Sequence, residues 1–167
     1  MTGMSAGTGP RPQRRIRSYL NVMSLHVRDF READRKAVVS LWDACALTRP
    51  WNDPDGDIDL ALRSREATLL VGSSQDVIVA TVMVGHDGHR GWVYYLAVDA
   101  RHRGHGHGRE MMAEAELWLA SRRIPKVQLM VRADNADAGH LYETLGYERQ
   151  KVSVFGKWLG PERPQDG

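Results

Sequence analysis

A glycine-rich stretch in the second half of the chain has the residue types of an anion-binding turn. It reads Arg103-Gly104-His105-Gly106-His107-Gly108 and is followed by Arg109 and an apolar pattern of helical period. Glycines let the backbone turn tightly and bring N–H groups against a ligand, and a helix start carries partial positive charge. Arginine side chains suit phosphate oxygens. The stretch therefore predicts a phosphate-binding turn, although three glycines also suit a plain strand–helix connection.

The spacing of these glycines weakens two nucleotide-binding interpretations. The glycines run G-x-G-x-G rather than G-x-G-x-x-G, and no Lys-Ser or Lys-Thr pair follows them. A dinucleotide-binding fold normally has this turn after its first strand, whereas several strand patterns precede it here. The ligand must therefore be identified from the surroundings of the turn.

Histidines near the turn raise the question of a metal site. His102, His105 and His107 lie in or beside it, and His86 and His89 lie upstream. Histidines two residues apart in a glycine turn lack the ligand spacing of a zinc site, and no thiolate or carboxylate partner is fixed beside them. We expect no metal, with the histidine side chains facing outward while their amides serve the ligand.

The single cysteine, Cys45, gives no sign of covalent catalysis. It shares a helical face with Val38, Leu41 and Trp42, which favours burial as a small apolar residue. One cysteine forms neither an internal disulfide nor a four-thiolate zinc site. A reducing, cytoplasmic setting is the expected one.

Apolar periodicity predicts the elements that position the glycine turn. Residues 68–71 and 77–84 read as a hairpin, and the apolar run 92–98 (WVYYLAV) reads as a strand covered on both faces. A helix follows the glycine turn, and residues 127–131 read as the next strand. Such a strand–helix–strand crossover places its two strands parallel. The sequence thus predicts an α/β fold with a mixed sheet that is antiparallel in its first half.

Further elements flank this core. They are a strand at 25–27, a helix along 38–45, a short helix capped by Asp57, a helix along 138–145 and a last strand at 152–158. The 167 residues, 42% hydrophobic and 26% charged, fit one domain. We expect a flexible basic extension at 1–22, a domain at 23–159 and a loose tail at 160–167.

The small positive net charge of +2 comes from the N-terminal extension. Residues 1–22 hold four arginines and no acid, so acids outnumber basic residues in the rest of the chain. The charge of the rest of the chain therefore gives no indication of nucleic-acid binding through a positive electrostatic field. No apolar run is long enough for a membrane span.

The glycine turn and a second motif downstream together resemble the GNAT superfamily of acyl-CoA-dependent N-acetyltransferases. The family pattern Q/R-x-x-G-x-G/A is met at 103–108. The pattern N-x-x-A-x-x-x-Y-E-x-x-G-F/Y is met at 135–147, with Tyr142 at the tyrosine position. The segments RPWNDP and GHDGHRG further resemble a bacterial subgroup, the YpeA-like acetyltransferases.

The resemblance implies a GNAT-like mixed central sheet with a parallel strand pair splayed around an acyl-CoA site. Acetyl-CoA is the implied acyl donor. Backbone groups of Leu96 and Val98 are expected to pair with the pantetheine arm as an added strand would. Asn135 is expected to hydrogen-bond that arm. The implied cofactor-binding residues are Leu96, Ala97, Val98, Arg103, Gly104, His105, Gly106, His107, Gly108, Arg109 and Asn135.

The implied reaction is direct attack of an amine on the thioester, with no covalent acyl-enzyme. Tyr142 is the expected catalytic residue, the general acid for the leaving thiolate, although its place on an apolar helix face also suits a core aromatic. The strand at 92–98 has no carboxylate, so the general base stays open. The candidates are Asp53, His86, Asp87, His89 and ordered water.

Acceptor recognition is expected in the loop 49–55 and the turn 86–90. The residues named for it are Trp51, Asn52, Asp53, His86, Asp87 and His89. Trp51 also suits a plug of the core under the loop. The expected partner is a small-molecule or peptide amine, without nucleic acid or membrane, and a homodimer stays open. The alternative function is a non-catalytic acyl-CoA-binding or sensor module.

Overall fold

The computed structural model describes residues 24–49 and 52–159 and contains a mixed sheet of five strands in the order β1-β2-β3-β4-β5. The strands are β1 (His26–Asp29), β2 (Ala67–Ser74), β3 (Val77–His86), β4 (Gly91–Val98) and β5 (Val127–Leu129). The first four pair antiparallel, and β4 pairs parallel with β5. The predicted α/β fold with a mixed sheet is confirmed.

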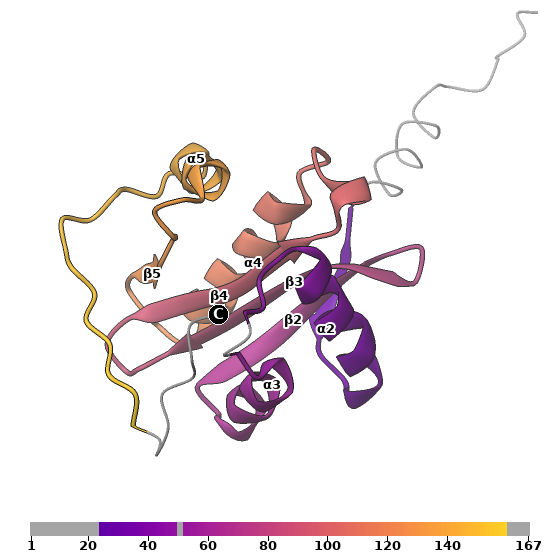
Figure 1. Ribbon diagram of the computed structural model, residues 1–167, viewed down its shortest axis with the longest axis horizontal. Coiled ribbons are helices and arrows are strands. Elements are labelled where there is room, and N and C mark those ends of the chain that lie inside the picture. Colours follow the sequence, from indigo (N-terminus) through magenta and orange to yellow (C-terminus); the bar gives the residue numbers. More distant parts are fainter. Residues whose placement is uncertain (1–23, 50–51, 160–167) are drawn as a thin grey trace, which may run out of the picture.

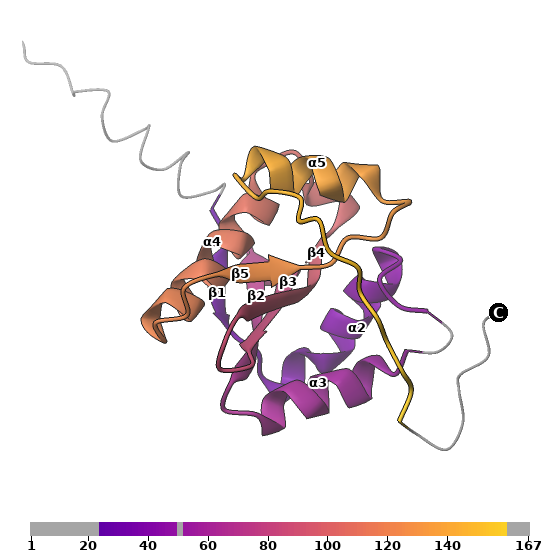
Figure 2. The same ribbon diagram turned by 90° about the vertical axis from the view of Figure 1, so that its left-hand side faces the viewer.

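Helices cover both faces of this sheet (Figure 1). They are α2 (Arg35–Ala44), α3 (Pro54–Arg63), α4 (His107–Ser121) and α5 (Ala136–Thr144), with the short 3-10 turns η1 (Glu32–Asp34) and η2 (Ala100–His102). Figure 2 shows α2 and α3 on one side and α4 and α5 on the other. Within the two described ranges, no helix is both long and apolar enough to cross a membrane.

Each face of the sheet has its own apolar cluster because strand side chains alternate between faces. On β3, Val82 and Val84 pack toward Met111 of α4, whereas Met83 joins the cluster that contains Trp42 of α2. Trp42 and Met111 are completely buried. The sheet is therefore anchored from both sides, which fixes the course of β4 between them.

A bulge bends β4 at its centre. Thr81 pairs with Ala97 and Met83 pairs with Tyr94, so two residues of β4, Tyr95 and the one after it, stand opposite a single residue of β3. Tyr95 has φ +49°, a left-handed conformation that is uncommon for a bulky residue. Bulges of this kind bend a strand and change where its side chains point.

Buried contacts hold the bulge in place. The Thr81 hydroxyl accepts a hydrogen bond from the Trp42 indole nitrogen at 2.9 Å and donates one to the carbonyl of Tyr95 at 3.0 Å. The rings of Trp42 and Tyr95 are stacked with their centroids 3.8 Å apart. The strained residue is thus fixed by α2 and β3 rather than left free.

Replacing Thr81 by valine should lower the free energy of unfolding by roughly 1–3 kcal/mol. Valine keeps the shape but leaves the buried indole N–H of Trp42 without its acceptor. Urea unfolding followed by tryptophan fluorescence measures the effect. Thr68→Val is the matched control, because the Thr68 hydroxyl bonds Asp29 at an exposed position and its loss should cost less than about 0.5 kcal/mol. Equal losses in the two variants would contradict the role of Thr81.

The parallel strands β4 and β5 pair over three residues only, the first three of β4 and all of β5. The paired residues are Gly91 with Val127, Trp92 with Gln128 and Val93 with Leu129. β5 then ends, whereas β4 runs on to Val98. Beyond Val93, the edge of β4 that faces β5 has no strand partner among the described residues. This is the splayed pair that the resemblance implied.

The predicted last strand at 152–158 is wrong. The structure gives these residues no regular secondary structure, and their apolar side chains are exposed, Phe155 to 94%. Alternating β-branched residues favour a strand only where a neighbouring strand and a covering layer are present. Neither is provided for this segment by the described part of the chain.

The predicted cap of the short helix α3 is also corrected. Asp53, not Asp57, is the N-cap, and its carboxylate accepts a hydrogen bond from the Gly56 N–H at 3.0 Å. Pro54 occupies the first helical position, where its fixed φ and missing N–H are tolerated. The helix therefore begins earlier, and Asp57 lies inside it with its side chain available for other contacts.

Candidate functional site

The glycine-rich turn connects η2 to α4. Gly104 and Gly106 have φ of +77° and +84°, and Gly106 directly precedes the helix. A Cβ atom at either glycine would meet no described atom within 4 Å, so the backbone conformation, not crowding, requires glycine there. The first N–H groups of α4 have no partner within the helix. Together with the helix dipole, they make a position suited to an anion.

The arginines around the turn are engaged with the protein. Arg103 donates from Nε to the carbonyl of Val98 at 3.1 Å, at the end of β4. The Arg101 guanidinium forms an ion pair with the carboxylate of Asp99 at 3.1 Å. This contact and the hydrogen bond from the Arg101 backbone N–H hold the pKa of Asp99 below its usual range. The glycine-rich turn therefore offers mainly backbone N–H groups to an anion, and the side chain of Arg109 is exposed beside it.

His107 corrects the expectation that the histidine side chains face outward. His107 is only 6% exposed, and its Nδ1 lies 3.6 Å from Glu110 Oε2, beyond hydrogen-bond distance. The signal was in the sequence, because His107, Met111 and Ala115 recur at intervals of four on the buried face of α4. His105 is exposed, as expected.

No group of three or more potential metal-ligating side chains occurs among residues 24–49 and 52–159. The histidines of the turn are spread over different surroundings: His102 contacts Asp99, and His105 contacts the carbonyl of His102. The turn therefore offers backbone N–H groups rather than a set of converging ligands.

The open edge of β4 presents backbone groups at Leu96 and Val98. The Asp99 N–H donates to the carbonyl of Val79 on β3 at 2.8 Å. Because peptide groups alternate along a strand, Ala97 and Asp99 face β3, whereas Leu96 and Val98 face the unpaired side. Leu96 and Val98 thus stand where an extended ligand could pair as an added strand.

One of these backbone groups is already occupied. The Val98 carbonyl accepts from Arg103 at 3.1 Å and lies 3.5 Å from the thiol sulfur of Cys45. The N–H of Val98 and both groups of Leu96 are left for a ligand. Cys45 itself is half-buried at this contact, so its packing role is combined with one hydrogen bond to β4.

Asn135 begins α5 and caps it. Its side-chain oxygen accepts a hydrogen bond from the Ala138 N–H at 3.1 Å. This contact uses the acceptor of the amide and leaves its NH₂ group as the donor that can reach a ligand. The capping role was missed in the sequence, although asparagine is among the favoured residues at an N-cap.

Tyr142 lies on the face of α5 that packs toward the sheet. Its ring is half-buried against the α4-side cluster and meets Tyr147 edge to face, with centroids 5.7 Å apart. Burial raises the pKa of Tyr142 to about 12. Its hydroxyl makes no hydrogen bond to another described residue, whereas that of Tyr147 donates to Glu116 at 2.7 Å. The Tyr147 hydroxyl is therefore engaged within the protein, whereas the Tyr142 hydroxyl is available as a hydrogen-bond donor.

The end of β4, the start of α4 and helix α5 meet at Gly108. A Cβ atom there would lie 3.6 Å from Leu141 and 3.9 Å from Val98. Tyr142 follows Leu141 directly, so the free phenol belongs to the same neighbourhood as the glycine turn and the unpaired edge. Three segments far apart in sequence are brought together at this point.

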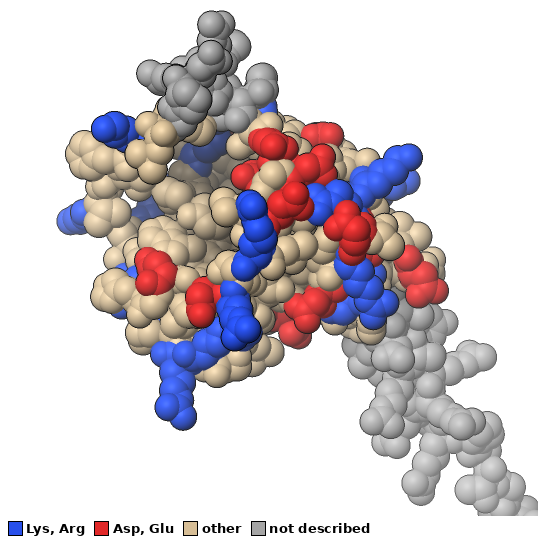
Figure 3. All heavy atoms as spheres, turned by 90° about the horizontal axis from the view of Figure 1, so that it is seen from below, with Lys and Arg blue, Asp and Glu red and all other residues tan. Residues whose placement is uncertain are grey.

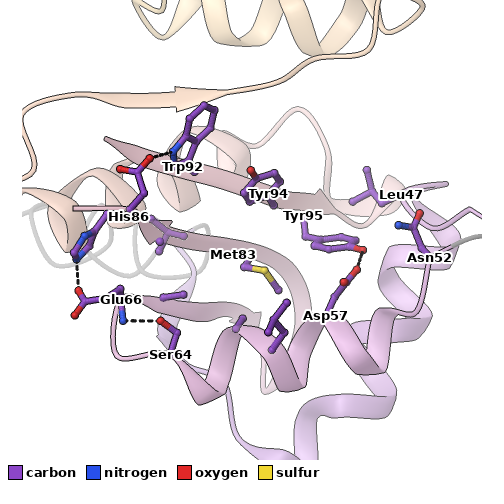
Figure 4. A pocket seen from close by; sticks show the side chains of 16 residues that line it. Leu47, Asn52, Asp57, Ser64, Glu66, Met83, His86, Trp92, Tyr94 and Tyr95 are labelled. Atoms are coloured by element: carbon purple, nitrogen blue, oxygen red, sulfur yellow. Dashed lines mark hydrogen bonds and ion pairs between the residues drawn. The ribbon is translucent and has the colours of Figure 1, made fainter. Parts of the chain in front are cut away.

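A second feature lies on the other face of the sheet. The surface seen from below is hollowed, with acidic and basic side chains interspersed around it (Figure 3). A cavity of about 760 Å³ lies between α3, β3 and β4 (Figure 4). Its lining residues include Leu47, Asn52, Asp57, Leu60, Ala61, Ser64, Glu66, Ala67, Met83, Val84, Gly85, His86, Asp87, Trp92, Tyr94 and Tyr95.

Half of the residues named for acceptor recognition line this cavity. Asn52, His86 and Asp87 do so, whereas Asp53 is used as the cap of α3 and His89 lies outside the lining in the β3–β4 turn. Trp51 lies outside the described residues. The prediction from the loop and turn thus identified the two ends of the cavity but not its wall.

The wall consists of residues that sequence reasoning missed. Neighbouring residues on a regular strand point to opposite faces, yet Tyr94 and Tyr95 both line the cavity. The reason is that Tyr95 belongs to the bulge, which begins directly after the pair of Met83 and Tyr94. Tyr95 donates from its hydroxyl to Asp57 Oδ2 at 2.5 Å, and burial with this contact raises the pKa of Tyr95. A regular alternation along 92–98 could not reveal this arrangement.

The candidate general bases differ in how far their side chains are already engaged in hydrogen bonds within the protein. Asp87 accepts from the N–H groups of Arg90 and His89 and from the Trp92 indole, which together hold its pKa below the usual range. Its carboxylate therefore stays ionised and has few free lone pairs. His86 contacts Glu66 at 2.5 Å. Two further carboxylates line the cavity outside the set of candidates: Asp57, which accepts the Tyr95 hydroxyl, and the more exposed Glu66.

Comparison with known proteins gives a consistent family signal. The model of the acetyltransferase (GNAT) family matches residues 24–147. An acetyltransferase of Pectobacterium atrosepticum is 42% identical over 139 residues, which cover 83% of this chain and 99% of that protein. An acetyltransferase of Yersinia enterocolitica is 41% identical over 135 residues, covering 81% of this chain and 96% of that protein.

Solved structures share the fold at low sequence identity. AAC(6')-Iy, in complex with the bisubstrate analog CoA-S-monomethyl-acetylneamine, matches with a TM-score of 0.69 and 12% identity over 80% of this chain and 97% of that one. The aminoglycoside 6'-N-acetyltransferase AAC(6')-IG of Acinetobacter haemolyticus, in its apo form, matches with a TM-score of 0.68 and 18% identity over 81% and 99%. At these identities the likeness concerns the arrangement of the elements.

Proposed function

Because the chain belongs to the acetyltransferase (GNAT) family, we propose that it transfers an acetyl group from acetyl-CoA to an amine by direct attack. The observation that carries this proposal is the meeting of three features at Gly108: the unpaired edge of β4, the glycine turn before α4, and α5 with Tyr142. An extended donor with a phosphate group at one end and a reactive group further along fits this arrangement.

The donor is placed by backbone groups. The pantetheine arm would lie along β4, with hydrogen bonds to Leu96 and to the N–H of Val98. The pyrophosphate would lie on the N–H groups of residues 106–109, where the helix dipole favours negative charge. The NH₂ group of Asn135 is the further donor to the arm. Each of these groups is free of other described partners or faces open space.

The chemistry needs an uncharged amine held close to the thioester carbonyl, and positioning accounts for much of the rate. A nitrogen–carbon bond forms and the carbon–sulfur bond breaks. The amine loses a proton to water, and the departing thiolate is stabilised by the Tyr142 hydroxyl and gains a proton. The cavity beside β4 is the proposed acceptor site, because it lies next to the bulge, which falls within the unpaired stretch of β4.

An acceptor panel tests this function. The chain is incubated with acetyl-CoA and amino acids, peptides with free N-termini, polyamines or aminoglycosides, and the products are identified by mass spectrometry. We expect an acetylated amine and a stoichiometric free thiol with at least one class, without added metal. Tight binding of acetyl-CoA with no acetylated product from any class would favour a non-catalytic acyl-CoA-binding module instead.

A further inference from the structure

The cavity between α3 and β4 has carboxylates at both of its ends. Figure 4 shows Asp57 and Tyr95 at one end, and Glu66 and His86 at the other, with Met83 between them. None of the described lining residues is a lysine or an arginine. A ligand inside this cavity therefore meets negative charge at two separate positions and a mainly apolar surface between them.

The inner end lies next to the proposed donor site. Asp57 Oδ2 accepts the hydroxyl of Tyr95, and Tyr95 directly precedes Leu96, whose backbone faces the open edge of β4. Stacking on Trp42 and the hydrogen bond from Thr81 to its carbonyl fix Tyr95. The remaining lone pairs of Asp57 can accept from a nitrogen placed close to the thioester.

The outer end, beside Glu66 and His86, holds two carboxylates, those of Glu66 and Asp87. Glu66 Oε2 contacts His86, while Glu66 Oε1 has no hydrogen bond to a described residue. Asp87 receives the Trp92 indole N–H at 3.1 Å, and hydrogen bonds from backbone N–H groups and this indole keep its pKa below the usual range. This end thus combines a fixed negative charge with one free carboxylate oxygen.

The surface between the ends is apolar and partly uncovered. Leu60 of α3 is 65% exposed and Tyr94 of β4 is 44% exposed, although both are large apolar side chains. Together with Met83 they suit the alkyl part of a ligand, and an aromatic face also attracts a cation. Trp92 and Tyr95 mark the two ends and lie three residues apart on β4, roughly 10 Å at strand spacing.

We propose that the acceptor is a linear diamine or polyamine, held by its distal ammonium at Glu66 and Asp87 while its reacting nitrogen lies at Asp57. The proposal rests on the proposed acetyl transfer. The reacting nitrogen is uncharged when it attacks and becomes positive as the nitrogen–carbon bond forms, so the carboxylate of Asp57 stabilises it where charge develops. It then releases its proton to water, the carbon–sulfur bond breaks, and the distal ammonium is unchanged.

The test compares amines that differ only in the second cation. Butylamine, 1,4-diaminobutane and spermidine are assayed as acceptors at saturating acetyl-CoA, and spermidine binding is measured separately by calorimetry in the presence of CoA. We expect kcat/KM for spermidine to exceed that for butylamine by at least 10-fold, about what one charge-assisted hydrogen bond gives. The longer spermidine should also exceed 1,4-diaminobutane, since the two ends lie far apart.

Two substitutions separate the two ends. Glu66→Gln should raise KM and Kd for spermidine about 10-fold with little change in kcat, and should leave butylamine unaffected. Asp57→Asn should lower kcat for both amines. Asp59→Asn is the matched control, because Asp59 lies on the same helix outside the cavity and pairs with Arg35 at 2.7 Å. It should change neither parameter.

The outcomes distinguish this inference from acetyl transfer itself. Equal kcat/KM for butylamine and spermidine, or spermidine binding that Glu66→Gln leaves unchanged, overturns the polyamine proposal while acetyl transfer stands. Spermidine binding that depends on Glu66, without acetylation of any amine, supports the ligand class of the cavity and overturns the proposed function.

Discussion

Replacing Gly106 by aspartate should abolish the binding of CoA and acetyl-CoA. Gly106 directly precedes α4, its φ is +84°, and its Cα faces open space where the pyrophosphate is proposed to lie. A side chain there blocks the approach of the ligand to the backbone N–H groups, and its carboxylate repels phosphate and takes its place at the helix start. Aspartate is chosen because it tolerates left-handed conformations and caps helices, which limits the loss of stability.

Calorimetric titration of CoA into the wild type and the variant measures this effect. Gly88→Asp is the matched control: Gly88 has φ +82° and equally open surroundings, but it lies in the turn before β4, whereas Gly106 follows the end of that strand. The control should bind CoA with unchanged affinity and melt at a temperature similar to that of Gly106→Asp. Equal CoA affinities in all three proteins would rule out the glycine turn as the phosphate site.

The parts of the fold that the sequence predicted are those encoded by local patterns. Apolar alternation gave the hairpin of β2 and β3, and the continuous run at 92–98 gave the central strand β4. The strand–helix–strand crossover through α4 then predicted β4 and β5 to be parallel, as they are. The glycine turn between β4 and α4 follows from the same order of elements, which is why the position of the proposed donor site could be anticipated.

The parts that were missed depend on contacts between distant residues. The bulge that brings both Tyr94 and Tyr95 to one cavity is held by contacts with Thr81 on β3 and Trp42 on α2. Both residues are distant from β4 in the sequence, so the pattern of residues 92–98 gives no indication of the bulge. Asp57 was taken for a helix cap, although Pro54 made the earlier start of α3 readable. The cavity proposed for the acceptor was therefore predicted only at its two ends, through Asn52 and Asp87.

A substitution at Tyr142 tests whether helix α5 contributes to the chemistry of the site or only to packing. A pKa of about 12 keeps the phenol protonated at neutral pH, so its hydroxyl is a permanent hydrogen-bond donor. Full proton transfer to a thiolate, whose acid has a pKa of about 8.5, is therefore unfavourable. We therefore expect the main contribution to be a hydrogen bond to the negative charge that develops on sulfur, a role comparable to that of an oxyanion donor.

Tyr142→Phe should lower kcat by ~10²-fold or more with little change in acetyl-CoA affinity, because removing one such donor costs about that much. The ring and its edge-to-face contact with Tyr147 are kept, and the hydroxyl has no described protein partner to leave unsatisfied, so the melting temperature should be nearly unchanged. Tyr147→Phe is the control in the opposite sense: it breaks a hydrogen bond to Glu116 and should affect stability more than turnover. Rates are measured at saturating acetyl-CoA with an acceptor for which chemistry is rate-limiting. Wild-type turnover in Tyr142→Phe would leave this tyrosine as a packing residue and move the stabilisation of the thiolate to backbone groups or water.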